Sequence, residues 1–358
     1  MTKKKDIVIS VILLALMFGA VALLDQNLSQ TGIIMTVLKK GCIYSLVAVS
    51  MNLLNGFTGL FSLGQAGFML IGGYTYAILT IPSDARDSVY QYFDGGILNF
   101  SVPFWVGIIA AGIVAALFAW LIGLPVLRLK SDYLAIATLG FAEIMRAFFQ
   151  WDKLGPLTNG SNMLRKYPSF STLMFPAVVS ALCIAMIVLL INSSYGRAFK
   201  AIRDDEVAAE AMGINLAHHK RMAFCISSFF AGVGGALLAM YQTTIQASAF
   251  KSAMTYEILL IVVIGGLGSI TGSILATFLF YACSEWWLRF LDSPMTIGDF
   301  TVPLLRSGFR KVVFSVVIML IVLFARQGIM GDHEFSVAGI RRFFQKRFGK
   351  AGQEGGQS

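Results

Sequence analysis

The chain has 358 residues, of which 57% are apolar and 13% are charged, and its formal net charge is +9. Ordinary soluble domains have about 45–50% apolar and about 25% charged residues, so no aqueous fold could bury this much apolar surface. The composition therefore predicts an integral membrane protein and excludes an ordinary soluble enzyme. The positive charge is typical of cytoplasmic membrane loops, which collect Lys and Arg, and we expect no nucleic-acid partner.

Apolar runs that are long enough, or nearly so, to cross a bilayer recur along the chain. The first is predicted to be a retained span rather than a signal peptide, because it is long and ends without a small-residue cleavage site. We predict an all-α, polytopic membrane protein of about ten transmembrane helices over residues 1–331, with a basic cytoplasmic tail over residues 332–358. The predicted spans lie near residues 7–24, 33–54, 60–81, 103–127, 133–150, 173–191, 222–242, 254–267, 270–290 and 308–325.

Basic residues orient these spans. Lys3, Lys4 and Lys5 place the N-terminus in the cytoplasm, and an even number of crossings returns the basic tail to the same side. Nine spans would result if residues 254–290 crossed once, but the tail would then lie outside. We therefore expect both termini to be cytoplasmic.

Two glycine clusters interrupt the spans. Residues 53–74 carry six glycines and no charge, and a second cluster follows at residues 265–272. Glycine inside a helix costs about 1 kcal/mol relative to alanine, so the clusters need a physical reason. Short, glycine-interrupted segments in corresponding places of two halves indicate inverted repeats around a transport pathway. Close packing of helices through small residues explains them equally well.

If the clusters form a pathway, the glycines let the backbone thin, bend or unwind beside a small solute. Irregular backbone at membrane depth is tolerated only where protein buries it or where it lines a wet cavity. Nearby amide and hydroxyl side chains add hydrogen bonds or hold helices together. The candidate pathway residues are Asn52, Asn55, Gly56, Gly59, Ser62, Gly64, Gln65, Gly67, Gly265, Gly266 and Gly268.

The spans lack the side chains that catalysis would need. His218, His219 and His333 all lie in predicted cytoplasmic segments, the four cysteines lack metal or disulfide spacing, and no P-loop is present. Glu143 and Arg146 are spaced to neutralise each other on one helix, and the other intramembrane charges are too sparse for a proton relay. We expect no catalytic residue, no metal and no cofactor, and a driving force that comes from elsewhere.

The longest cytoplasmic connection, residues 196–221, contains a short helix. Asp204 is predicted to cap it, with Asp205 and Glu206 in the first turn, and Gly213 to end it in a left-handed conformation. Its small apolar face fits a groove on another protein, and the alternative is a solvated helix without a partner. The candidate coupling residues are Arg203, Asp204, Asp205, Glu206, Ala208, Glu210, Ala211 and Gly213.

Five blocks of sequence carry a resemblance to a known family. Residues 52–68, 132–143, 157–162, 195–214 and 257–269 resemble LivM-like permeases of ABC importers for branched-chain amino acids. The block at 195–214 is similar to the EAA-type loop that couples such permeases to their ATPases. The chain departs from the family pattern at Gln65, where some relatives have His, and at residues 325–328, where a proline is missing.

The resemblance implies the membrane half of an ATP-driven importer of Leu, Ile or Val in the inner or plasma membrane of a prokaryote. It implies a LivH-like second permease subunit, either a paralogue or a second copy, with two cytoplasmic ABC ATPase subunits and an extracytoplasmic substrate-binding protein. Our hypothesis for the cycle is alternating access, in which ATPase closure displaces the helix at residues 205–212 and rigid packing carries this movement to the glycine clusters. Permeases for urea and other small amides look similar, and an ion-coupled secondary transporter of the same solutes is the second alternative.

Overall fold

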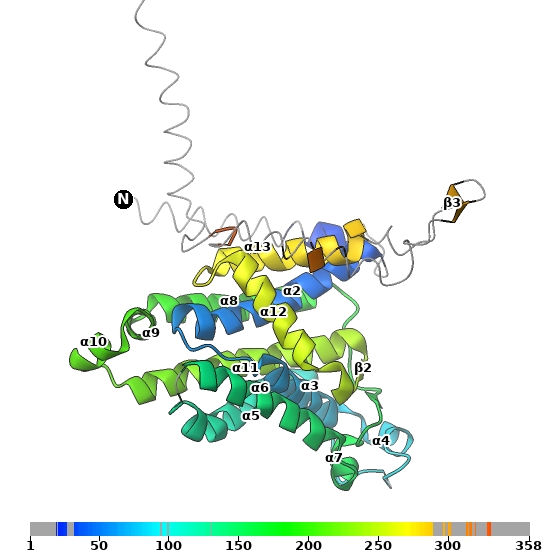
Figure 1. Cartoon of the computed structure of the whole chain (residues 1–358). Coiled ribbons are helices and arrows are strands. Elements are labelled where there is room, and N and C mark those ends of the chain that lie inside the picture. The colour runs from blue at the N-terminus through cyan, green and yellow to red at the C-terminus, as the bar shows by residue number, and fades with distance from the viewer. Residues whose placement is uncertain are drawn as a thin grey trace, which may run out of the picture.

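The computed structural model (Figure 1) describes residues 32–288 apart from 94, 99 and 130, together with residues 19, 21–26, 296–297, 300–301, 313, 315–316, 319 and 328–330. The first and last predicted spans, at 7–24 and 308–325, fall mostly outside these residues. The tail predicted at 332–358 lies outside them as well. The division into a membrane domain and a tail therefore stays a prediction.

The described part of the chain is built from helices, which confirms the all-α prediction. Four helices are long and apolar enough to cross a membrane, and a fifth span is formed if the pair α3 and α4, bent by 120°, counts as one. The total of ten crossings stays a prediction. The longer helices are α2 (Ile33–Asn52), α3 (Gln65–Thr80), α5 (Phe104–Val126), α6 (Ser131–Gln150), α8 (Met174–Asn192), α11 (Leu216–Gln242), α12 (Ser252–Gly265) and α13 (Ile270–Tyr281).

Shorter elements connect these helices. Two antiparallel pairs of very short strands, β1 with β2 and β3 with β4, are the strands of the described residues. The remaining helical elements include two π-helical turns, η1 and η4. The short elements are η1 (Leu53–Phe57), α4 (Ser83–Val89), η2 (Asp152–Leu154), α7 (Gly155–Thr158), β1 (Leu164–Arg165), α9 (Ser194–Asp204), α10 (Glu206–Ala211), β2 (Thr244–Ile245), η3 (Ala247–Ala249), η4 (Ala282–Trp286), β3 (Thr296–Ile297) and β4 (Phe300–Thr301).

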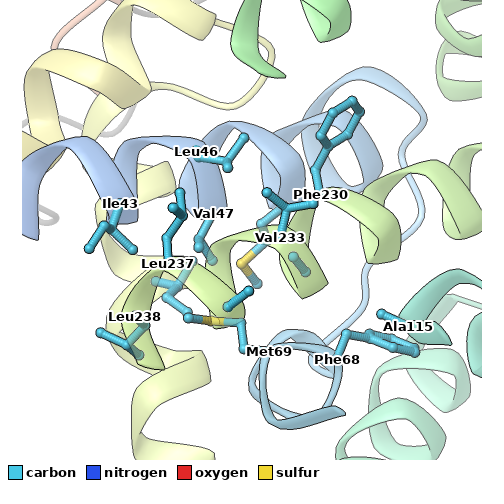
Figure 2. Close-up of a cluster of buried hydrophobic side chains, with 14 of the residues drawn as sticks. Ile43, Leu46, Val47, Phe68, Met69, Ala115, Phe230, Val233, Leu237 and Leu238 are labelled. Carbon is cyan, nitrogen blue, oxygen red and sulfur yellow. The ribbon is translucent and has the colours of Figure 1, made fainter. Parts of the chain in front are cut away.

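The core forms around α11, which packs against α5, α3 and α2. The helices approach closely because small residues face each other: a Cβ at Gly232 would lie 2.6 Å from the Cβ of Ala115, and one at Gly72 would overlap the Gly232 backbone. Packing through small residues is the usual device of helices in lipid. Figure 2 shows the apolar side chains that fill the space between them: Ile43, Leu46, Val47, Phe68, Met69, Ala115, Phe230, Val233, Leu237 and Leu238.

The outward faces of α5 and α8 remain apolar. On α5, Ile109, Ile113 and Leu117 follow each other at four-residue spacing and are each more than half exposed, and on α8 Leu182 and Leu189 are exposed by 62% and 72%. Continuous apolar surface of this kind marks contact with a membrane or a protein partner. Along the bundle, α9 and α10 lie at one end, and α4, α7 and β2 lie at the other (Figure 1).

Candidate functional site: two helix breaks and a coupling segment

The first glycine cluster breaks the chain between α2 and α3. After α2, the π-helical turn η1 runs over Leu53–Phe57, and regular helix resumes only at Gln65. Gly59 has a φ of 73°, a left-handed conformation that glycine adopts without a steric penalty. The run predicted as one span at 60–81 therefore begins with five irregular residues, 60–64, and continues as the 16-residue helix α3. We call residues 53–64 the first break.

The second glycine cluster separates α12 from α13. Gly266 has a φ of 112° and Gly268 a φ of 91°, so both positions require glycine. Ser269 then caps α13, because its side chain accepts a hydrogen bond from the backbone N–H of Gly272. We call residues 266–269 the second break.

Asn52 joins the two breaks. Its Nδ2 donates to the carbonyl oxygens of Gly266, at 3.3 Å, and Ser269, at 2.9 Å, while its Oδ1 accepts from the N–H of Gly268 at 2.8 Å. The residue is fully buried, and a Cβ added at Gly56 would overlap the Gly268 amide nitrogen. Two segments that are about 200 residues apart in the chain are thus in direct contact, a relationship that sequence reasoning did not predict.

The other predicted polar residues, which lie in the first break or directly after it, bond within the protein. Asn55 closes the break, since its side chain accepts from the N–H of Ser62 at 3.1 Å and donates to the Ser62 carbonyl oxygen. Gln65 donates to the hydroxyl of Ser50 at 2.7 Å, and the Ser50 carbonyl oxygen accepts from Ser227 of α11. These contacts match the helix-joining role that the sequence left open. Their role in lining a passage stays a prediction.

The remaining candidate glycines allow close approach of backbones. A Cβ at Gly67 would lie 2.8 Å from the Cα of Ala142 in α6, and one at Gly265 would lie 2.6 Å from the carbonyl carbon of Gly272. At Gly64 an added Cβ would lie 3.2 Å from the nearest backbone oxygen. Larger side chains at Gly67 or Gly265 would push helices apart.

The coupling segment consists of two short helices, α9 and α10. Asp205 caps α10, because its side chain accepts from the backbone N–H groups of Val207, at 2.8 Å, and Ala208, at 3.1 Å. The prediction that Asp204 is the cap is wrong: α9 continues through Asp204, so the extended residue between the helices is Asp205. The left-handed end at Gly213 is confirmed, with a φ of 84°.

The predicted apolar face of α10 points away from the rest of the chain. Val207 and Met212 are 79% and 83% exposed, and Ala208 and Ala211 are exposed as well. Glu206 forms an ion pair with Lys220 at 2.6 Å, which ties the start of α10 to α11. An exposed apolar face with a fixed position is suited to a groove on a partner protein.

Arg203 connects this segment to the first break. Its Nη1 donates to the carbonyl oxygen of Gly56 at 3.3 Å, and a Cβ at Gly59 would lie 3.0 Å from the Arg203 Cγ. The ammonium group of Lys200, also on α9, lies 5.6 Å from the centre of the Phe57 ring. The sequence identified Arg203 as a coupling residue but carried no signal for this contact, which depends on how α9 packs.

A cavity of about 370 Å³ lies between the first break and α10. Gly59 and Leu60 line one side, and Glu206 and Lys220 line the other. The rest of its lining is Leu127, Arg128, Leu129 and Leu134, so α10 and the first break face each other across this space.

Charged side chains of the described residues join helices to one another. No three His, Cys, Asp or Glu side chains of the described residues lie close enough to hold a metal ion. The predicted pair of Glu143 and Arg146 is confirmed at 2.6 Å, and Glu143 also accepts hydrogen bonds from the hydroxyl and the N–H of Ser252. This carboxylate therefore joins α6 to the start of α12.

The described helices thus form a membrane domain with two touching breaks in its interior and, at one end, a short helix with exposed apolar side chains. The family described as the permease component of the branched-chain amino acid transport system matches residues 33–325. The chain belongs to this family.

Several relatives are similar along most of the chain. The high-affinity branched-chain amino acid transport system permease protein LivM of Escherichia coli is 33% identical over 285 residues, which cover 71% of this chain and 63% of that protein. The probable LivM of Methanocaldococcus jannaschii is 27% identical over 264 residues, or 64% of this chain and 74% of the relative.

The similarity extends to the second permease type. LivH of Escherichia coli is 22% identical over 311 residues, which cover 82% of this chain and 93% of that protein. In the comparison with the Escherichia coli LivM, by contrast, the chain spans less than two thirds of that protein's length. No solved structure matches the chain.

Proposed function

We propose that this chain is the membrane-spanning permease subunit of an ATP-driven importer that carries branched-chain amino acids into the cell. The family and the names of its LivM and LivH relatives support the substrate class. The contact of Arg203 with the first break, which in turn touches the second, carries the mechanical part of the proposal.

The partners follow from the same relatives. A LivH-like permease would pair with this chain, two ABC ATPase subunits would bind the end that carries α10, and a binding protein would deliver solute at the opposite end. The end with α9 and α10 is then cytoplasmic. The exposed apolar residues Val207 and Met212 offer the surface for an ATPase groove.

In the proposed cycle, ATPase closure displaces α10 and, through its short connection, α9. Arg203 passes this displacement to Gly56 and Gly59, where the backbone is irregular and therefore easier to move than a complete helix. Gly56 lies against Gly268, so the two breaks shift together. A discrete rearrangement of packed elements of this kind is how switching proteins amplify small displacements.

Reconstitution tests the proposal and its alternatives. Vesicles that contain this chain, the second permease and the ATPases should take up radiolabelled leucine only with internal ATP and external binding protein. Uptake by this chain alone in ATP-free vesicles would favour a secondary transporter. Uptake of urea that leucine does not inhibit would assign the system to small amides.

A further inference from the structure

A second cavity, of about 270 Å³, lies at the end of the bundle opposite to the coupling segment. The long helix α11 connects the two ends: it starts beside α10, and its last residue, Gln242, lines this cavity. The 27 residues of α11 span about 40 Å. Pockets for drug-sized ligands commonly measure about 300–1,000 Å³, and this cavity lies just below that range, which suits a smaller solute.

The cavity carries one positive and one negative side chain. Lys251 lies directly before α12 and is exposed, while Glu257 lies six positions further along the chain, about 9 Å along the helix axis. A hydrogen bond orients the Glu257 carboxylate, since the hydroxyl of Tyr281 donates to its Oε1 at 3.2 Å. Tyr281 in turn packs against Tyr44, another lining residue, with ring centres 4.8 Å apart.

The wall next to these charges is apolar. Leu238 and Phe250 are 2% exposed and form its buried part, and Met254 of α12 is partly exposed beside them. A methionine side chain is flexible and adapts to ligands of different shape. The cavity therefore offers opposite charges and an apolar surface within the space of one small molecule.

We propose that this cavity is an entry site that binds the transported amino acid as a zwitterion. Glu257 faces the ammonium group, the flexible Lys251 side chain reaches the carboxylate, and Leu238, Phe250 and Met254 contact the aliphatic side chain. Paired opposite charges offset the loss of hydration when a zwitterion leaves water. The inference rests on the proposed function and adds to it the place where solute first meets this chain.

Cysteine protection tests the site without any ATPase. Met254→Cys is introduced into the full chain after the four native cysteines have been replaced by alanine, and the protein is placed in phosphatidylglycerol vesicles. A water-soluble thiol reagent then labels the new cysteine. We expect millimolar leucine to slow labelling at least threefold, while the 2-hydroxy acid analogue and 3-methylbutylamine, each lacking one charge, have little effect.

Matched variants show whether the charges are responsible. Glu257→Gln and Lys251→Gln, each combined with Met254→Cys, should abolish protection by leucine, measured as the ratio of labelling rates with and without leucine in the same variant, because removing a nearby charge also changes the rate without leucine. Met163→Cys is the control, because Met163 is 54% exposed and lies beside β1 but does not line the cavity. Leucine should not alter its labelling.

Three outcomes would overturn the inference: no protection by leucine, equal protection by all three compounds, or protection that survives both charge removals. Slow labelling that appears only when ethanolamine lipid is added would instead assign the cavity to a lipid headgroup. ATP-driven uptake by the assembled transporter without leucine protection would reject this site and leave the proposed function intact. Leucine protection without ATP-driven uptake would support this binding site and reject the proposed function.

Discussion

Arg203 of α9 donates a hydrogen bond from Nη1 to the carbonyl oxygen of Gly56, over 3.3 Å, and lies against Gly59 in the same break. A helix break has backbone carbonyl groups without helical partners, so a side chain from another helix can bind there. This places a charged residue of the coupling segment on the part of the membrane domain that is easiest to deform.

Replacing Arg203 by alanine should uncouple ATP hydrolysis from transport. We expect uptake to fall at least about fivefold, the lower range of a typical coupling energy between two sites. ATPase co-purification should stay at the wild-type level, because the exposed face of α10 is unchanged. Arg197→Ala is the matched control, since Arg197 is an exposed residue of the same helix. Wild-type uptake by Arg203→Ala would show that the contact transmits nothing.

A side chain at Gly268 should abolish uptake. Gly268→Val places a β-branched residue at a φ of 91°, which strains the backbone of the second break where its N–H binds Asn52. The control is Gly140→Ala, because a Cβ at Gly140 meets nothing within 4 Å and alanine favours the helix by about 0.5–1 kcal/mol. Protein levels in the membrane are measured beside uptake. If Gly268→Val only lowers these levels and the remaining protein transports normally, the break serves packing alone.

Removing the cap of α10 should weaken ATPase binding. Asp205→Ala deletes both hydrogen bonds to the first turn of the helix, and loss of such a cap costs about 0.5–2 kcal/mol. Asp204→Ala is the control, since Asp204 forms only an exposed pair with Arg203. The yield of ATPase subunits in pull-downs from solubilised membranes gives the comparison. Equal yields for both variants would contradict a docking role for α10.

Asn52→Ala should destabilise the membrane domain. The substitution leaves the buried N–H of Gly268 without its partner, which costs about 1–3 kcal/mol. It also removes the bonds to the carbonyl oxygens of Gly266 and Ser269, each of which keeps a backbone N–H partner. We expect the midpoint of thermal unfolding in detergent to fall by several degrees. Asn55→Ala should have a smaller effect, because Asn55 bonds only within the first break. A midpoint that does not change in Asn52→Ala would indicate that water replaces these contacts.

The sequence by itself determined the class of protein, its helical architecture and the places where helices break. These properties are local: the apolar content of a run decides whether it suits lipid, and a glycine cluster predicts an interruption wherever positive φ values such as those of Gly59, Gly266 and Gly268 are needed. The coupling helix and its left-handed end at Gly213 were predictable for the same reason. The cap was misplaced by one residue because the pattern did not reveal that α9 extends through Asp204.

Only the tertiary structure decided which of these parts touch. Most of these contacts join segments that lie far apart in the chain. They are the bonds from Asn52 to the second break, the contact of Arg203 with Gly56, and the cavity that brings Lys251 and Glu257 beside Tyr44. Such contacts depend on how helices cross, which is set by the summed packing of many small residues. No single motif in the chain encodes that sum.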